Sequence, residues 1–242
     1  MSKLRITRLG HGGILYRSPS DKWLWVDRWS GAPTYVAPPE PWQVDVIAPT
    51  HGHFDHVGND AADVVELASR GGTVVCSHEM SIYLASRGVE AVGMNKGGRF
   101  EAAGIGFTMV HAEHTGGVTV TGGEAEATRE VGCWGWLLEF EDGTRVYHTG
   151  DTDLFGDMAL VKDRWAPSIT VLPIGGHYTM GPADAGRAVG LIGAKVVIPV
   201  HYATFPALAG TPAQLAAATD AQVVALEPGA VSYTHLTLPT KA

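Results

Sequence analysis

The chain has 242 residues, of which 45% are hydrophobic and 17% are charged, a composition typical of a compact globular protein and not of a disordered one. Lysine and arginine number 17 against 25 acidic residues, and the resulting net charge of -8 argues against a general binder of nucleic acid or of anionic membranes. Only two cysteines occur, Cys76 and Cys133, each inside an apolar run and outside any CxxC pair. This excludes a zinc ribbon or a disulfide framework and indicates buried free thiols.

The beginning of the chain alternates charged and apolar residues over positions 1–9, without the uninterrupted apolar core of a signal peptide. No later apolar stretch reaches the length needed to cross a membrane. We therefore expect a cytoplasmic protein that has no membrane partner.

The first half of the chain predicts short strands followed by alternating strands and helices. Strands are expected at 4–9, 14–17 and 23–27, with glycine and proline turns between them. A proline-rich loop at 31–42 follows, and then a strand at 44–48, a helix at 59–70, a strand at 73–76 and a helix from Ser77 to about residue 86. Tryptophans alternate along the strands, as core residues do.

The second half repeats this theme and predicts one more set of strands and helices. Strands are expected at 106–110, 134–140, 144–147, 169–172 and 196–200, and helices near 154–161, 183–192 and 213–218. Because these elements interleave without a regular βαβ period, we expect an α/β (α+β) fold in which helices cover two packed sheets. Residues 116–132 indicate an inserted hairpin or mobile loop.

The end of the chain divides into two parts. A strand and turn are expected over 223–231, whereas residues 232–242 continue no pattern of the preceding chain. We therefore predict a single domain over residues 1–231 and a non-native or disordered tail over 232–242, and His235 is left out of the candidate site.

The strongest chemical signal follows a buried strand and precedes a helix, at His51, His53, Asp55 and His56. Four ligand-type side chains within six residues cannot be buried without hydrogen-bond partners or a metal. In an extended turn, His51 and His53 point the same way and can share one cation, while Asp55 and His56 turn toward a second position. Gly52 leaves room for the backbone to pass closely.

Three further apolar runs also end in ligand-type residues. These are His111 and His114 after 107–110, His148 and Asp151 after 145–147, and His201 after 196–200. Because pockets gather where loops leave the same edge of packed sheets, we expect these residues to converge on the 51–56 turn. Together they can fill two metal shells.

The order of these motifs resembles the metallo-β-lactamase superfamily, whose mark is HxHxDH followed by a His, an Asp and a final His. The shorter motifs Leu9-Gly10-His11, Pro173-Ile174-Gly175-Gly176 and Tyr178-Thr179-Met180-Gly181-Pro182 are similar to its short metal-dependent hydrolases, relatives of the phosphorylated-ascorbate lactonase. The likeness covers about residues 4–231. It implies a four-layer αββα sandwich and two divalent cations.

The resemblance also implies two sets of metal ligands and a residue shared between them. One metal is assigned to His51, His53 and His114, the other to Asp55, His56 and His201, with Asp151 as the bridge. His114 is preferred to His111 because Ala112-x-His114-Thr115 resembles the family's ligand loop, whereas the side chain of His111 faces the sheet.

Four other residues carry two interpretations each. His148 is expected to pack beside the site and not to bind metal. His177 either donates a proton to the reacting group or is an ordinary loop histidine. His11 is a turn histidine or a pocket residue. Asp27 supports the site or only ends its strand, and Arg28 departs from the proline that relatives usually show after this aspartate.

The predicted chemistry is hydrolysis by a metal-bound hydroxide. Two cations would lower the pKa of a shared water toward about 7, Asp55 would orient the hydroxide, and His177 would assist the leaving group. Zinc suits a ligand set that is rich in histidine and free of thiols, and manganese or iron also fits nitrogen and oxygen ligands.

The leading functional hypothesis is hydrolysis of a small ester, lactone, amide or phosphoester, with a small molecule as the only expected partner; a homo-oligomer is compatible with the sequence. A nuclease or phosphodiesterase of the transfer-RNA-processing type is the first alternative, but the insertion lacks the basic arm such an enzyme needs. An iron-dependent redox protein is the second. His53 argues against its flavodiiron form, which has Glu at that position, and no flavin-binding domain follows.

Overall fold

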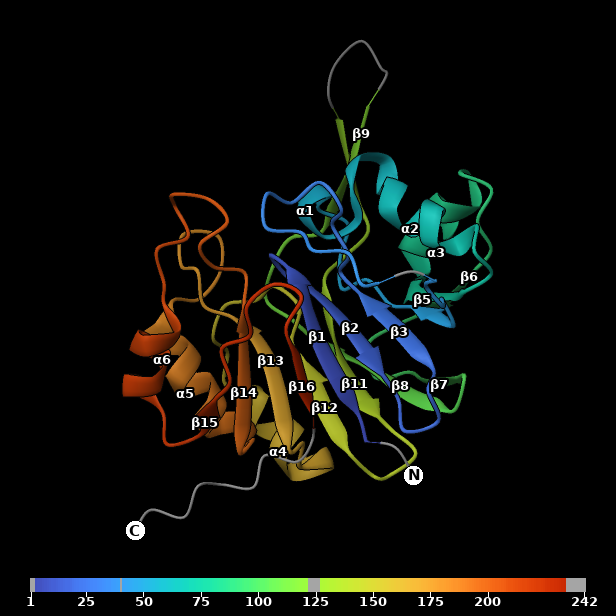
Figure 1. The fold of residues 1–242 in the computed structure, drawn as a ribbon. Coiled ribbons are helices and arrows are strands. Elements are labelled where there is room, and N and C mark those ends of the chain that lie inside the picture. Colours follow the sequence, from blue (N-terminus) through green and yellow to red (C-terminus); the bar gives the residue numbers. More distant parts are fainter. Residues whose placement is uncertain (1–2, 40, 122–126, 234–242) are drawn as a thin grey trace.

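Two seven-stranded sheets form the centre of the computed structural model, which describes residues 3–39, 41–121 and 127–233 (Figure 1). The first sheet has the order β16-β1-β2-β3-β4-β5-β6. Its strands are β1 (Arg5–Gly10), β2 (Gly13–Arg17), β3 (Trp23–Val26), β4 (Val46–Ile47), β5 (Thr73–Ser77), β6 (Ala91–Met94) and β16 (Val231–Tyr233). Strands β3 to β6 are parallel, whereas β1 pairs antiparallel with both β2 and β16.

The second sheet has the order β15-β14-β13-β12-β11-β8-β7. Its strands are β7 (Arg99–Ala102), β8 (Ile105–His111), β11 (Trp134–Glu139), β12 (Arg145–His148), β13 (Ile169–Pro173), β14 (Val196–Val200) and β15 (Gln222–Val223). Strands β12 to β15 run parallel, and β11 is antiparallel to both β8 and β12.

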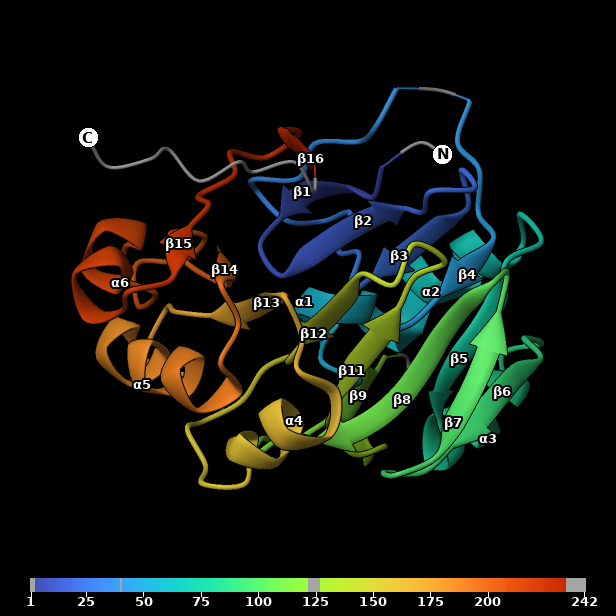
Figure 2. The ribbon, with the colours of Figure 1, turned by 90° about the horizontal axis from the view of Figure 1, so that it is seen from below.

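Helices lie against each sheet and complete the four-layer αββα arrangement that was predicted (Figure 2). Near the first sheet are α1 (Phe54–Val57), a 3-10 turn (Asn59–Ala61), α2 (Ala62–Ala68) and α3 (His78–Ala85); α2 contacts β4 and β5, and α3 contacts β5 and β6. On the second sheet are α4 (Met158–Trp165), α5 (Pro182–Ile192) and α6 (Pro212–Ala218). Pro182 occupies the first turn of α5, where its missing N–H costs nothing.

Successive side chains along the strands of the second sheet belong to two different parts of the core. In β11, Trp136 and Leu138 pack into the large core that both sheets share, whereas Leu137 between them packs toward α4 and α5. In β12, Val146 and Tyr147 divide in the same way. Successive side chains of a strand point to opposite faces, so a sheet covered on both sides must be apolar at nearly every position.

Strand direction brings the candidate ligands to one edge of the molecule. The pairings make β1, β3 and β4 of the first sheet parallel to one another, and likewise β8, β12, β13 and β14 of the second. The loops that leave the carboxyl ends of these strands therefore meet, at the edge that faces upward in Figure 1. Every candidate site residue named above lies in one of these loops, at the end of one of these strands or, for Asp55 and His56, in the short helix α1 that follows β4.

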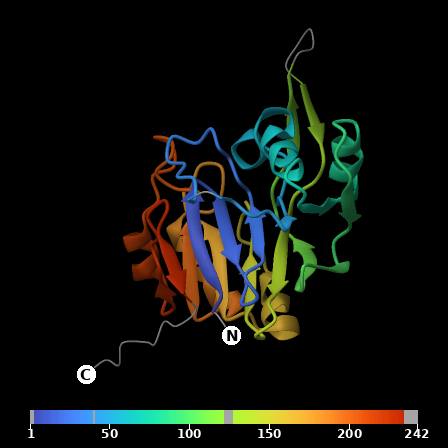
Figure 3. The same cartoon turned by 45° about the vertical axis from the view of Figure 1, so that its right-hand side comes forward.

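Most predicted elements are confirmed, and the differences have local causes. Helix α4 begins at Met158, four residues later than expected at 154, because the Asp153 side chain accepts from Leu154 N–H in a turn that precedes the helix. Strands β6 and β7 were not predicted. The 116–132 segment contains a hairpin of β9 (Gly117–Val120) and β10 (Ala127–Glu130), which projects beyond the helices (Figure 3).

The end of the chain differs from its prediction. A strand and a turn were predicted over 223–231; the structure has a turn there, and the two short strands on either side of it belong to different sheets, β15 to the second and β16 to the first. Ser232 and Tyr233, assigned to the tail, pair with Ile6 and Arg5 of β1. Residues 234–242 of the predicted tail lie outside the described residues. No helix in the described ranges combines the length and the apolar character that a membrane span requires.

Candidate metal centre

The 50–56 turn begins directly after β4 and forms the floor of the site. His53 is the N-cap residue of α1, and its carbonyl oxygen accepts from the N–H groups of His56 and Val57 at 2.9 and 3.1 Å. The turn is tied to the second sheet because Trp134 N–H donates to the Thr50 carbonyl oxygen at 3.0 Å. A Cβ atom on Gly52 would lie 2.6 Å from the Val118 side chain, so a larger residue would push the turn away from β9.

Two groups of ligand-type side chains converge on this turn. In the first, His51, His53 and His114 place one ring nitrogen each within 4.8 Å of one another. In the second, a carboxylate oxygen of Asp55 and one ring nitrogen each of His56, His201 and His11 lie within 4.8 Å of one another. The structure thus brings together all six residues that the resemblance divided between two metals, in the same two sets, and a third group of Asp27, His51 and His56 takes one of the six from each set.

Asp151 lies between the two groups. Its Oδ2 atom is 3.0 Å from His201 Nε2 and 3.3 Å from His56 Nε2 in one group, and 3.8 Å from His114 Nε2 and 4.0 Å from His51 Nε2 in the other. The preceding Gly150 has φ +64, and its Cβ position would lie 2.7 Å from the Thr50 side chain. Only glycine both adopts this left-handed backbone without strain and lets Asp151 approach the turn.

Burial and neighbouring charges shift the pKa values of several of these side chains in opposite directions. Burial would raise the pKa of the Asp151 carboxyl, but the imidazoles of His201 and His56 hold that pKa well below its usual range. Burial would lower the pKa of His201, and the Asp151 carboxylate raises it to about 9. Burial, with His56 nearby, holds the pKa of His51 well below its usual range. The centre therefore contains fixed carboxylate charge that requires buried positive charge beside it.

A divalent cation pair fits this donor set. The buried Nε2 atom of His56 makes no well-aligned hydrogen bond within the described residues, as expected of an atom that binds a cation. Cys133 lies beside the site, but its thiol donates to the Asp151 carbonyl oxygen at 3.4 Å and burial raises its pKa well above the usual value. The donors are therefore imidazole nitrogens and carboxylate oxygens, which suit zinc, manganese or iron.

Asp27 orients the ligand turn from behind. Its carboxylate accepts from Thr50 N–H at 2.8 Å and from the Thr50 hydroxyl at 2.7 Å, and lies 3.0 Å from His56 Nδ1. The opposite ring nitrogen of His56 faces Asp151. A carboxylate behind a ligating imidazole fixes its orientation and increases its basicity.

Asp27→Asn should therefore lower the affinity for zinc by about 10- to 100-fold, as removal of such a partner typically does, while asparagine still tolerates the positive φ of 49 at this position. Competition with a chromogenic chelator measures the affinity. Asp21→Asn is the matched control, since Asp21 also has a positive φ, of 65, but pairs with Arg5 and Arg17 away from the site. Unchanged affinity in Asp27→Asn would mean that Asp27 only ends its strand.

Several histidines left open by the sequence now have positions. His111 is exposed and contacts Glu113 and Lys96. His148 is buried, and its Nδ1 atom lies 2.9 Å from the Tyr16 hydroxyl oxygen, so it packs behind the site. His177 is exposed, with its ring edge-on to Tyr178 at 4.4 Å.

His11 is the site residue that sequence reasoning underrated. It lies in a turn with φ 43, as the first interpretation held, but it is fully buried and its Nε2 atom is 3.1 Å from Asp55 Oδ2. Its carbonyl oxygen also accepts from the N–H of His201. The signal that points to it is its place after β1, a strand that ends at the ligand edge.

A cavity of about 490 Å³ opens onto both metal groups. It is lined by the ligands His53, Asp55, His114, Asp151 and His201 and by Phe54, Thr115, Thr119, Tyr178 and Phe205. His177 is not among these lining residues. This volume is within the usual range for small-molecule sites.

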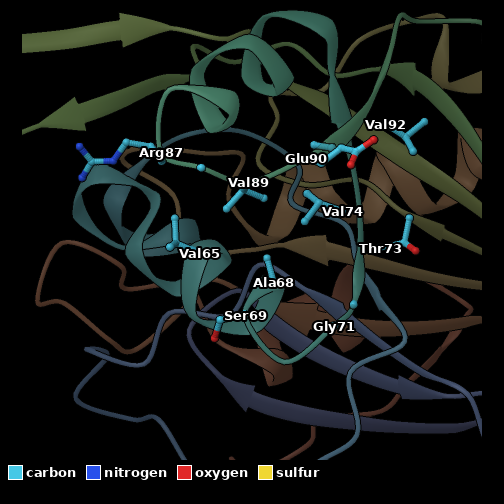
Figure 4. A pocket seen from close by; sticks show the side chains of 13 residues that line it. Val65, Ala68, Ser69, Gly71, Thr73, Val74, Arg87, Val89, Glu90 and Val92 are labelled. Atoms are coloured by element: carbon cyan, nitrogen blue, oxygen red, sulfur yellow. The ribbon is translucent and has the colours of Figure 1, made fainter.

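A second cavity, of about 520 Å³, lies between α2 and strands β5 and β6 (Figure 4). Val65 and Ala68 of α2 face Val74 and Val89 across it, and Arg87 points away at its rim. None of the predicted site residues lines it, so the chemistry belongs to the first cavity.

Comparisons with known proteins show the family to which the chain belongs. A family model described as the beta-lactamase superfamily domain matches residues 23–202. A UPF0173 metal-dependent hydrolase of Herpetosiphon aurantiacus is 41% identical over 241 residues, which cover 95% of this chain and 97% of that protein. A relative of the same description from Methanosarcina mazei is 39% identical over 235 residues, covering 95% and 98%.

Solved structures show the same fold. Igni18, a metallo hydrolase of Ignicoccus hospitalis, superposes with a TM-score of 0.80 at 29% identity, covering 96% of this chain and 98% of that one. An isothiocyanate hydrolase from Delia radicum gut bacteria superposes with a TM-score of 0.69 at 16% identity, covering 94% and 98%. At 16% identity, the likeness to the isothiocyanate hydrolase shows a shared fold alone.

Proposed function

The chain belongs to the metallo-β-lactamase superfamily and is a metal-dependent hydrolase, and from this premise we propose that it cleaves a small ester, lactone, amide or phosphoester at a centre of two divalent cations. The observation that carries the proposal is the position of Asp151, whose single oxygen Oδ2 lies within 4.0 Å of four histidines from both ligand groups. A carboxylate in that place suits two cations better than one.

His51, His53 and His114 would hold one cation, and Asp55, His56 and His201 the other, with Asp151 facing both. When bound, such cations lower the pKa of water and polarise a carbonyl or phosphoryl oxygen. Zinc is the favoured metal for this set of imidazoles and carboxylates. A cytoplasmic location, which we also propose, accords with the two buried free cysteines.

The protein's own groups then orient the reactants. Asp55 borders the cavity and is held by His11, so its carboxylate is in position to orient the attacking water and accept its proton. We assign the donation of a proton to the leaving group to His177, whose ring lies 4.4 Å from that of Tyr178, a residue that lines the cavity.

Elemental analysis combined with chromogenic ester, lactone and phosphodiester substrates tests this proposal. We expect two metal ions per chain and turnover of at least one substrate class. A chelator-stripped sample should be inactive and should recover on addition of zinc, manganese or iron. Turnover that persists in the stripped sample would overturn the proposed mechanism, and a single ion per chain would overturn the two-metal centre.

A further inference from the structure

The cavity in front of the ligands has an aromatic wall, formed by Phe54, Tyr178 and Phe205. Phe54 is 42% exposed and Tyr178 is 59% exposed, and both exposed rings line this cavity. Solvent-accessible aromatic rings inside a concave site are typical of surfaces that a ligand covers.

The aromatic wall is held close to the reacting centre by the chain itself. Phe54 lies between the ligands His53 and Asp55, and Phe205 follows His201 by four residues. Trp29 supports both rings, edge-on to Phe54 at 5.5 Å and tilted against Phe205 at 5.9 Å. A substrate group that contacts these rings is therefore adjacent to the bond presented to the metals.

The lining also lacks fixed cations. Among the described residues that line the cavity there is no lysine or arginine, and the uncharged polar groups are the hydroxyls of Thr115, Thr119 and Tyr178. Sites that bind a phosphate or carboxylate tail usually place arginine or lysine against it. The cations at the centre would contact the reacting group of the substrate. A second anionic group elsewhere on the substrate would then have no cationic partner among the lining residues.

We propose that the substrate is an uncharged ester or lactone whose aryl or bulky alkyl group packs on the aromatic wall. The assignment of the bond rests on the proposed function, but the preference for a neutral apolar group rests on the cavity. In the reaction, the water oxygen forms the new bond to the carbonyl carbon and the ester carbon–oxygen bond breaks. The leaving oxygen keeps the electron pair and takes a proton from the water, which gives an alcohol and a carboxylic acid.

A binding experiment tests the preference without turnover. Phenylacetohydroxamic acid and succinic monohydroxamic acid carry the same metal-binding group, but one ends in a phenyl ring and the other in a carboxylate. Titration calorimetry on zinc-loaded protein should show tighter binding of the phenyl compound by at least about tenfold, the value of burying one aromatic ring. Equal binding, or tighter binding of the succinyl compound, would overturn the inference.

Variants of residues in the aromatic wall test whether the wall causes the preference for the phenyl compound. Phe205→Ala should remove most of the preference, Phe205→Leu should keep part of it, and Phe205→Arg should favour the succinyl compound. Ile82→Ala is the control, since Ile82 is 57% exposed on α3 and does not line the cavity. Metal content is measured for each protein. Tyr178→Ala, which changes no residue next to a ligand, should also weaken the preference, and unchanged selectivity in both alanine variants would refute the role of the wall.

Turnover separates this inference from the proposed function. The 4-nitrophenyl ester of phenylacetic acid should be hydrolysed with a kcat/KM about 10- to 100-fold above that of the 4-nitrophenyl monoester of succinic acid. Selective hydroxamate binding without hydrolysis of any ester would reject an ester as the bond that is cleaved and leave the cavity assignment standing. Hydrolysis of both esters at equal rates would support an ester as the bond that is cleaved and reject the preference for a neutral apolar group.

Discussion

Asp151→Asn is expected to abolish turnover and metal retention together. Asparagine keeps the shape of the side chain but removes the charge that four imidazoles surround, with the nearest nitrogen 3.0 Å away. Both groups of ligand-type residues then lose the carboxylate that they share. The loss of metal affinity should therefore exceed roughly 100-fold, the upper limit for variants of residues that only support a ligand from behind. Elemental analysis and initial rates on the same preparation measure both effects.

The control for this variant lies two residues away. Asp153 is exposed, and its carboxylate accepts only from Leu154 N–H among the hydrogen bonds found in the described residues, a bond that an asparagine oxygen would retain. Asp153→Asn should keep its metal and its rate. Full activity with two bound metals in Asp151→Asn would show that Asp151 does not join the two groups.

Removal of metal is expected to produce the largest change in thermal stability. Free metal at 1,000 times its dissociation constant adds about 4 kcal/mol to the free energy of unfolding, which for a chain of this size raises Tm by about 8 to 16 °C. Scanning calorimetry of chelator-treated and zinc-loaded samples gives the difference. Equal Tm values would mean that the centre does not hold metal in the folded state.

The difference in Tm between zinc-loaded and chelator-treated protein should also widen as the pH rises from 7 to 10. The pKa of His201 is raised to about 9 by Asp151, so protonation of His201 stabilises the metal-free fold below the unfolded pKa of about 6.5, and this contribution is lost as the pH rises through 9. Metal binding shows the opposite dependence because protons compete for the same nitrogen. A constant difference across this range would contradict the coupling of His201 to Asp151.

The position of the site at one sheet edge explains how separate loops act as one centre. The His51 turn and Asp151 follow strands of different sheets, and backbone hydrogen bonds join the two sheets at this edge, as between Trp134 and Thr50. Asp27 and His11 then hold individual ligands from behind. Because the supports come from short turns directly after β1 and β3 and not from long loops, the protein itself holds these ligand-type side chains in place.

Most strands, the family and the local cluster of ligand-type residues were predictable from the sequence, whereas β6 and β7 were not. Side chains of buried strands are apolar at nearly every position, so the runs that form β8, β11, β13 and β14 are legible without a structure. The 51–56 motif is local, and its four ligand-type residues leave few alternatives to metal binding. Helix α4 was misplaced because residues 153–157, an irregular segment and a short turn, carry acidic residues that also suit a first helical turn.

The contacts that were not predicted from the sequence depend on how separate loops pack against one another. His11 and Asp55 are 44 positions apart, and their contact follows from the packing of a turn after β1 against the turn after β4. The aromatic wall likewise joins Phe54, Tyr178 and Phe205 from loops after β4, β13 and β14, and in the sequence each appears as an isolated aromatic residue. Local patterns record burial and periodicity, whereas contacts between loops depend on strand order and direction, which no single segment encodes.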